Sequence, residues 1–176
     1  MRRSLVVGLV LALLAFLAVP AMAAPGDDTA TCSISCAVGQ IMEWESNFPA
    51  INLGTIASRT ASPSDSASVN LYTNGDVEIT ADNNAAAQLD DGNGNTLVTE
   101  YQLAYDADGT SDTGGSDVAW TAYDSFLTGG SAVTHVSQDG VVQVTLHARA
   151  SNPSGNVADV GSYSATQTLT ASWTSP

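Results

Sequence analysis

The chain has 176 residues, with 18 acidic and four basic residues and a formal net charge of −14, and its length suits one domain of ordinary size. So few basic residues leave no patch that could neutralise a phosphate backbone, which argues against nucleic acid as a partner. The same deficit argues against electrostatic binding to an anionic membrane surface.

Residues 1–23 have the pattern of a secretory signal peptide. Arg2 and Arg3 form its charged start, residues 5–19 are apolar, and Ala21-Met22-Ala23 is a small-x-small cleavage site. Removing these 23 of the 176 residues leaves 153, which carry two arginines, no lysine and 18 acidic residues, a net charge of −16. No later apolar run approaches the roughly 20 residues of a membrane-spanning helix. We therefore expect a secreted protein, in the periplasm or at the extracellular cell surface, with no membrane insertion.

The first predicted elements are strands with one apolar face. Residues 31–38 alternate between apolar and polar side chains, residues 41–45 continue as an extended apolar stretch, and residues 51–56 alternate again. We expect residues 24–36 to be a flexible N-terminal segment or a donor strand, and residues 37–176 to be the folded domain.

Two turn dipeptides predict β-hairpins further along the chain. Asn74-Gly75 and Asp139-Gly140 are each flanked by alternating apolar residues, and such dipeptides favour the two-residue turns of hairpins. The second hairpin would join residues 133–137 to residues 141–148. The other predicted elements are one helical turn at 85–87, a central strand at 97–105, an irregular apolar segment at 119–127 and a last strand at 161–173.

The pattern of these elements predicts the fold class. No segment of ten or more residues has a helical period that is free of glycine, proline or a dense β-branched run. About seven to nine strands separated by Gly, Asn and Asp turns indicate an all-β protein, an immunoglobulin-like Greek-key β-sandwich.

Catalytic patterns are nearly lacking. The only histidines, His135 and His147, fall on the two arms of the second expected hairpin, and two imidazoles without a nucleophile make no catalytic unit. Glu43 and Glu45 share one face of a strand, a spacing that is common on solvated surfaces. We therefore expect no enzyme.

Cys32 and Cys36 are the only cysteines, in a chain whose expected export would expose them to oxidation. In a flat strand, four residues at about 3.3 Å each place the two Cα atoms about 13 Å apart, whereas a disulfide requires about 4.4 to 6.8 Å. Two interpretations stay open. The cysteines form a small intrachain ring closed by a tight turn, or the strand stays extended and the thiols bond to neighbours in an assembly.

An oxygen-rich loop resembles a calcium-binding loop. Asp106, Asp108, Asp112 and Asp117 occupy positions similar to 1, 3, 7 and 12 of such a loop, although Ser111 stands where the usual glycine would be. The alternative is that these residues are turn formers that satisfy their own backbone. Calcium is the one cofactor that the sequence suggests.

Two segments resemble pilin-like secreted domains of the spore coat protein U-like and chaperone-usher fimbrial group. Residues 161–173 are similar to the last strand of such domains, where a Gly-x-Tyr opening leads into an alternating strand that ends near an aromatic residue. Residues 52–56 are similar to their early Phe-Gly strand, with Leu53 in place of the aromatic residue. The cysteines depart from the pattern, because those domains often join two strands through well-separated cysteines.

The resemblance implies a non-enzymatic structural subunit of an extracellular fibre, pilus or coat, completed by a strand from a neighbouring subunit. Its partners would be further copies or related fibre subunits, with a periplasmic chaperone and an outer-membrane usher. The sequence supplies a candidate donor strand whose apolar face comprises Cys32, Ile34, Cys36 and Val38.

The alternative function is a secreted carbohydrate- or calcium-binding β-sandwich module. Trp44, Trp120 and Trp173 would supply its sugar-stacking platform, although most large aromatic residues of a sandwich this size fill the core.

Overall fold

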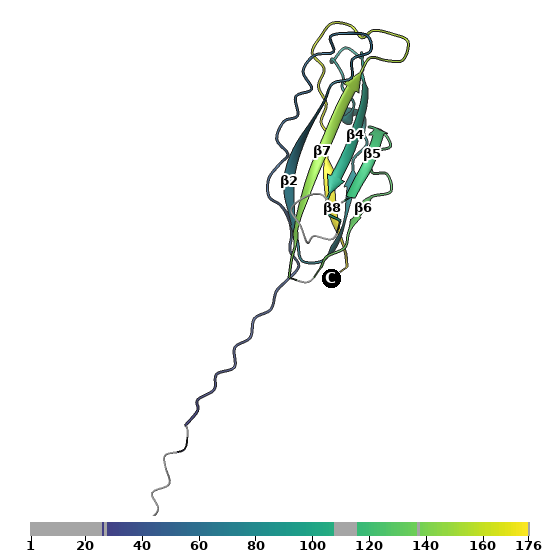
Figure 1. The fold of residues 1–176 in the computed structure, drawn as a ribbon. Coiled ribbons are helices and arrows are strands. Elements are labelled where there is room, and N and C mark those ends of the chain that lie inside the picture. The colour runs from purple at the N-terminus through teal and green to yellow at the C-terminus, as the bar shows by residue number, and fades with distance from the viewer. Residues whose placement is uncertain (1–25, 27, 108–115, 137, 176) are drawn as a thin grey trace, which may run out of the picture. The chain divides into compact units, whose positions relative to one another are not determined.

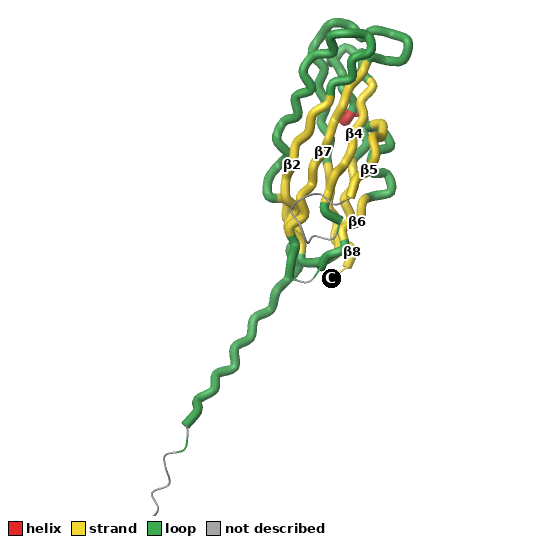
Figure 2. Tube along the Cα trace, viewed as in Figure 1, coloured by secondary structure: helices red, strands yellow, loops and turns green. Residues whose placement is uncertain are grey.

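The computed structural model describes residues 26, 28–107, 116–136 and 138–175, and the side chains of 116 and 117 are not described. The chain divides into two units, Met1–Ala37 and Val38–Pro176. In the first unit, the described residues belong to no helix or strand and are all exposed; Figure 2 draws them as loop. No helix within the described part of the chain is long and apolar enough to span a membrane.

The second unit is a β-sandwich of two antiparallel sheets (Figure 1), which confirms the predicted fold class. The larger sheet has the strand order β1-β2-β7-β4-β5 and the smaller one β6-β3-β8. In chain order, the elements are β1 (Met42–Trp44), β2 (Ser64–Thr73), β3 (Asp76–Ala81), the 3₁₀ turn η1 (Ala85–Ala87), β4 (Val98–Tyr105), β5 (Ser116–Ala122), β6 (Ser131–Val133), β7 (Val141–Ser151) and β8 (Leu169–Ser175).

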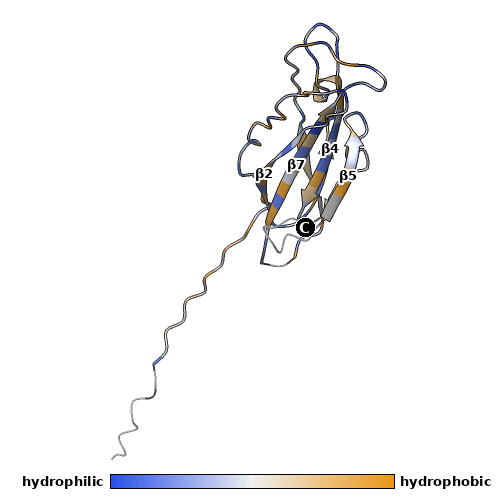
Figure 3. Ribbon diagram, turned by 45° about the horizontal axis from the view of Figure 1, so that its top comes forward, coloured by the Kyte–Doolittle hydropathy of each residue, from blue (hydrophilic) through white to orange (hydrophobic). Residues whose placement is uncertain are grey.

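The core lies between the sheets because side chains alternate along each strand. In β7 the buried positions are Val142, Val144, Leu146, Ala148 and Ala150, and the residues between them are partly exposed. Figure 3 shows this alternation as orange and blue bands along β7 and β4. Fully buried side chains also come from both sheets and from the segment after β5; they include Leu71, Ile79, Leu103 and Phe126. Each such side chain contributes about 1.5 to 3 kcal/mol by leaving water.

Both predicted hairpins are wrong, because each turn carries the chain from one sheet to the other. The strand before Asn74-Gly75, β2, pairs with β1 and β7, whereas β3 after it pairs with β6 and β8. Similarly, β6 lies in the smaller sheet and β7 in the larger one. None of Asn74, Gly75, Asp139 and Gly140 has a positive φ, which the favoured two-residue hairpin turns require.

The two glycines instead allow segments to approach closely. A Cβ atom on Gly75 would overlap the indole ring of Trp173, and one on Gly140 would overlap the carbonyl oxygen of Thr73. The Thr73 N–H donates to the carbonyl oxygen of Gly140 at 2.9 Å, and the Thr73 hydroxyl donates to that of Gly75 at 2.7 Å. Both inter-sheet turns therefore meet at Thr73.

Other predicted elements have mixed outcomes. The central strand is present as β4, between β7 and β5, and the helical turn is present as η1, where Asn84 Oδ1 accepts a hydrogen bond from the Ala86 N–H at 2.8 Å. The last strand begins only at Leu169, later than predicted, with one isolated bridge before it at Ser164. Residues 31–38 and 51–56 alternate in sequence but belong to no sheet. The alternation in residues 51–56 serves a different purpose at the candidate site.

Candidate functional site

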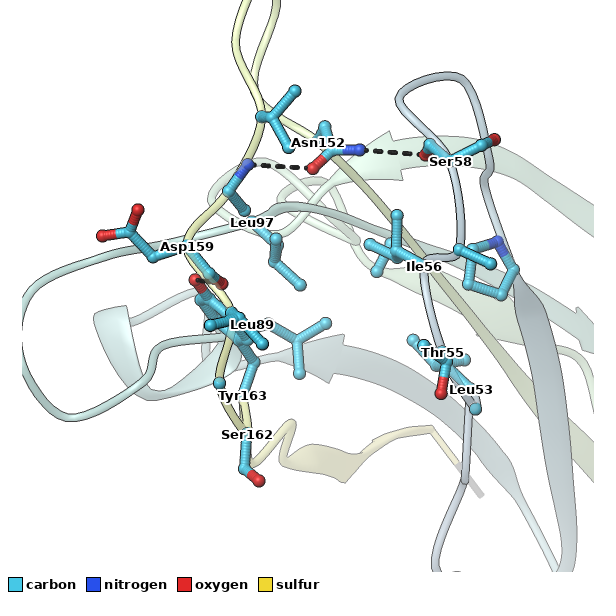
Figure 4. Close-up of a pocket in the computed structure, with 18 of the residues that line it drawn as sticks. Leu53, Thr55, Ile56, Ser58, Leu89, Leu97, Asn152, Asp159, Ser162 and Tyr163 are labelled. Carbon is cyan, nitrogen blue, oxygen red and sulfur yellow. Dashed lines mark hydrogen bonds between the residues drawn. The ribbon is translucent and has the colours of Figure 1, made fainter.

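A groove of about 820 Å³ lies within the second unit, between residues 50–59 and residues 157–163 (Figure 4). Its apolar lining includes Leu89 and Leu97, which face Ile56 from the opposite side. Leu97 belongs to the buried core, and Leu89 and Ile56 are half-buried. The floor of the groove is therefore an extension of the hydrophobic core.

The first wall, residues 46–59, is held over most of its length by its side chains. Trp44, Phe48, Ile51 and Leu53 pack against the core, and the rings of Trp44 and Phe48 lie 5.8 Å apart. Among the described residues, no main-chain hydrogen bond joins residues 46–57 to another segment. Apart from the Gly54 N–H and the Asn47 carbonyl oxygen, which bond to nearby side chains, this wall resembles the edge strand of a sheet in having no main-chain partner.

The second wall, residues 157–163, also pairs with no strand, and its main chain is bonded only to side chains at Ala158 and Asp159 among the described residues. Within the described part of the structure, no main-chain to main-chain hydrogen bond involves these residues. Val157 and Val160 are 66 % and 105 % exposed, and the Tyr163 hydroxyl donates to the carbonyl oxygen of Asp159 at 2.9 Å. Two open edges thus flank one apolar floor.

Asn152 ties the two walls together at one end of the groove. Its Nδ2 donates to the carbonyl oxygens of Ser58 and Arg59, each at 3.2 Å, and its Oδ1 accepts from the Ala158 N–H at 3.0 Å. Figure 4 shows the bond between Asn152 and Ser58. The amide fixes the distance between the two walls at this end, and it therefore keeps this end of the groove open.

Acidic groups surround Tyr163 on the second wall. Burial raises the pKa of the Tyr163 hydroxyl, and the charges of Asp91, Asp159 and Asp90 raise it further. Asp159 points away from the groove in Figure 4. The groove is therefore negative around Tyr163, while Arg59 also lines it. An uncharged apolar occupant avoids repulsion from these carboxylates.

The nearby carboxyl of Asp91 belongs to a self-contained loop. The Asn95 side chain donates to it at 2.8 Å, and the Asn93 N–H donates at 2.8 Å. These two bonds, in that order, lower its pKa to about 2. Asp91 therefore stays ionised at every physiological pH.

The candidate donor residues lie outside any sheet. Cys32, Ile34, Cys36 and Val38 are all exposed, Ile34 by 91 % and Val38 by 77 %, and both thiols are free. Neither interpretation of the cysteines is excluded by a free, exposed pair.

The predicted calcium loop is only partly covered. Asp106 is buried directly after β4, and its N–H donates to the carbonyl oxygen of Gln143 at 3.2 Å. Asp117 lies in β5, while Asp108 and Asp112 lie outside the described residues. Among the residues that are described, no three His, Cys, Asp or Glu side chains gather to hold a metal ion. Calcium binding stays a prediction.

The three tryptophans occupy three different places, so they form no common platform. Trp44 is in β1 and Trp120 in β5, at opposite edges of the larger sheet, and Trp173 is in β8 of the other sheet. The Arg149 guanidinium lies 4.5 Å from the centre of the Trp120 ring.

The histidines do not lie on a shared hairpin. His147 in β7 is opposite residues 66 and 102, and His135 follows β6 in the other sheet.

The sequence did not point to Leu89 in the floor of the groove or to Asn152, which joins its walls. Leu89 sits in a stretch that is otherwise turn-rich, and Asn152 precedes Pro153 in the manner of an ordinary loop residue. The walls, by contrast, had a signal, since residues 52–56 and the start of residues 161–173 are the two segments that resemble pilin-like domains.

Comparison with known proteins finds a likeness in structure but not in sequence. No protein-family model matches the chain, and no curated protein matches its sequence. The chain is similar to one in a solved structure of a chaperone-usher pilus, with a TM-score of 0.38 and 14 % identity over 86 % of this chain and 99 % of that one. A likeness at this level assigns no function, which must be argued from the groove.

Proposed function

We propose that this chain is a non-enzymatic subunit of an extracellular fibre, pilus or coat. In this proposal, residues 31–38 of one copy dock as a β-strand in the groove of the next copy. The observation that carries the proposal is that residues 46–57 and 157–163, on either side of an apolar floor, are described with no main-chain to main-chain hydrogen bond to another segment. An inserted strand would pair with such edges and place alternate side chains on the floor.

The donor segment suits this groove chemically. Its apolar residues recur at every second position, and none of residues 31–38 is charged, in a chain with 18 acidic residues. An uncharged segment can approach the acidic groups around Tyr163 without repulsion. Its large apolar side chains, Ile34 and Val38, are exposed, and exposed apolar side chains in series indicate an interaction surface.

Approximate free energies show why docking needs main-chain hydrogen bonds as well as apolar contacts. Burying Ile34 and Val38 contributes about 3 to 6 kcal/mol, whereas association costs about 4 to 15 kcal/mol. Apolar contacts alone are therefore too weak for a stable fibre. Each main-chain hydrogen bond adds about 0.5 to 1.5 kcal/mol, so pairing along both walls supplies the remainder.

The proposal also implies a cellular location and a set of binding partners. A chain whose residues 1–23 direct export would meet further copies, or related fibre subunits, in the periplasm or at the cell surface. An open groove flanked by unpaired edges is a liability before assembly. We infer that a periplasmic chaperone covers it until an outer-membrane usher brings subunits together.

The test compares the chain from Ala24 onward with a variant that also lacks residues 25–38. We expect the longer chain to form oligomers that resist denaturant, and the shortened one to stay monomeric and to bind a peptide of residues 31–38. A peptide of the same composition with its alternation scrambled is the control. A longer chain that stays monomeric at high concentration, with residues 31–38 protected from hydrogen exchange, would contradict the proposal.

A further inference from the structure

We propose that Cys32 and Cys36 form a redox switch that controls whether the donor segment can dock. A disulfide between them closes the segment into a ring, and its reduction restores the strand. This inference rests on the proposed function, because it concerns the same docking event.

The geometry makes the ring and the docked strand mutually exclusive. Docked as a strand, the segment holds the Cα atoms of Cys32 and Cys36 about 13 Å apart. A disulfide requires them within about 4.4 to 6.8 Å, so the main chain from Ser33 to Ser35 must fold into a turn. Ring closure thus takes the Ile34 side chain out of the row of apolar side chains. It also moves Cys32 and Cys36 away from the positions that they hold in a strand.

Both thiols are available to react. Cys32 and Cys36 are free and exposed, and each Sγ contacts only the carbonyl oxygen of the next residue, at 3.8 and 3.7 Å. Serine is a turn-forming residue, and Ser33 and Ser35 leave the intervening stretch free to bend.

The chemistry is thiol–disulfide exchange with a small-molecule disulfide such as oxidised glutathione. The Cys32 thiolate attacks one sulfur of the oxidant, which forms a mixed disulfide and expels one glutathione thiolate. The Cys36 thiolate then attacks Sγ of Cys32, forms the ring and expels the second. The two protons from the cysteines pass to the two glutathione thiolates. Two cysteines are oxidised and one disulfide is reduced, so electrons and atoms balance.

Docking would in turn protect the reduced form. Cys32 and Cys36 share the face of the segment that enters the groove, so in an assembled fibre both sulfurs would lie against the apolar floor. Exchange requires access to the sulfur, and the fibre would hold the thiols out of reach of the oxidant. Oxidation would therefore prevent assembly without dissolving what is already assembled.

The experiment uses the chain from Ala24 onward, with reduced or oxidised glutathione, and follows assembly by light scattering. Intact-mass measurement reports the ring as a loss of about 2 Da from the monomer. The control is Cys32→Ala/Cys36→Ala, which keeps apolar side chains but cannot form a ring; Cys32→Val/Cys36→Val replaces it if alanine proves too small to anchor the strand. Because only the open fraction can dock, nine-tenths ring formation should slow assembly about tenfold, and the control should respond to neither reagent.

The outcomes separate the switch from the proposed function. If the chain with a closed ring assembles as fast as the reduced chain, or if the oxidant yields only cross-links between chains, the switch is wrong and strand docking stands. If neither the reduced chain nor either cysteine-free variant assembles, the proposed function fails and takes the switch with it.

Discussion

The Cα atom of Gly75 lies against the indole ring of Trp173, with no room between them for a methyl group. The contact joins the first inter-sheet turn to the last strand, where the Ser175 hydroxyl also donates to Asp76 Oδ2 at 2.7 Å. The last strand, β8, is therefore held against the turn at both Trp173 and Ser175.

The close approach predicts the effect of Gly75→Ala. The added methyl group would force the ring of Trp173 to move, and overpacking of this kind costs about 1 to 3 kcal/mol. We expect the melting temperature to fall by about 2 to 10 °C, measured by near-ultraviolet circular dichroism. The matched control is Gly129→Ala, where a Cβ meets nothing within 4 Å. Equal losses in both variants would contradict the role of the contact.

The same turn shows what the sequence can and cannot predict about the fold. Alternation identified the strands around it correctly, because burial on one face leaves a local pattern. The partner of each strand leaves no such pattern. Asn74-Gly75 indicates a turn in either case, and the need for glycine comes from Trp173, which is distant in sequence. The pairing of β2 with β7 therefore had to be seen in the structure.

The sequence indicates the segments that form the walls of the groove, but it does not indicate that these segments enclose a groove. Ile51 and Leu53 are half-buried as the alternation of residues 51–56 predicts, but the alternation then breaks, because Thr55 is exposed and Ile56 is half-buried. The sequence does not reveal that the first wall lacks a neighbouring strand, because a missing strand leaves no pattern in the sequence. The tie at Asn152 depends on three carbonyl and amide groups brought together only by folding.

Asn152→Ala should loosen the groove. The substitution removes both bonds to the first wall and leaves the Ala158 N–H without its acceptor. Removing partners of polar groups in this way costs about 1 to 3 kcal/mol. We expect faster hydrogen exchange in residues 157–163 and weaker binding of the donor peptide. Asn156→Ala, on the same loop and exposed, should leave both measurements unchanged.

Asp91 predicts a specific dependence of stability on acid. Its pKa falls from 3.8 to about 2 in the folded chain, so its contribution to stability is present above about pH 4 and is lost as the pH falls towards 2. Asn95→Ala removes the largest cause and should raise the pKa of Asp91 towards 3.8 in a carboxyl NMR titration. A titration that does not move would show that the Asn95 amide is not what holds the carboxylate.

The two arginines that follow residue 23 should differ in their effect on stability. The Nε of Arg149 lies 2.8 Å from Glu100 Oε2, its guanidinium covers the Trp120 ring, and the two charged side chains are about one-third exposed. Exposure limits the ion pair to about 1 kcal/mol or less, and the ring contact adds about 0.5 to 1 kcal/mol. Arg149→Ala should therefore lower the free energy of unfolding by about 1 to 2 kcal/mol. Arg59→Ala, an exposed position, should change it by less than about 0.5 kcal/mol.

The sharpest test of strand docking places the same charge on each of the two faces of the donor segment in turn. Ile34→Asp removes an apolar anchor worth about 1.5 to 3 kcal/mol and would carry a carboxylate into the apolar floor, which costs several kcal/mol more. Ser35→Asp adds the identical charge one residue later, on the face that points away from the floor.

We therefore expect Ile34→Asp to weaken assembly more than about a hundredfold, which corresponds to about 3 kcal/mol. Ser35→Asp should change assembly by no more than about threefold, or about 0.7 kcal/mol. Analytical ultracentrifugation over a range of concentrations measures both. Because each variant lowers the net charge by one, charge repulsion between acidic subunits affects them equally and cannot produce the difference. Equal weakening by the two substitutions would mean that the segment does not dock as a strand with one buried face.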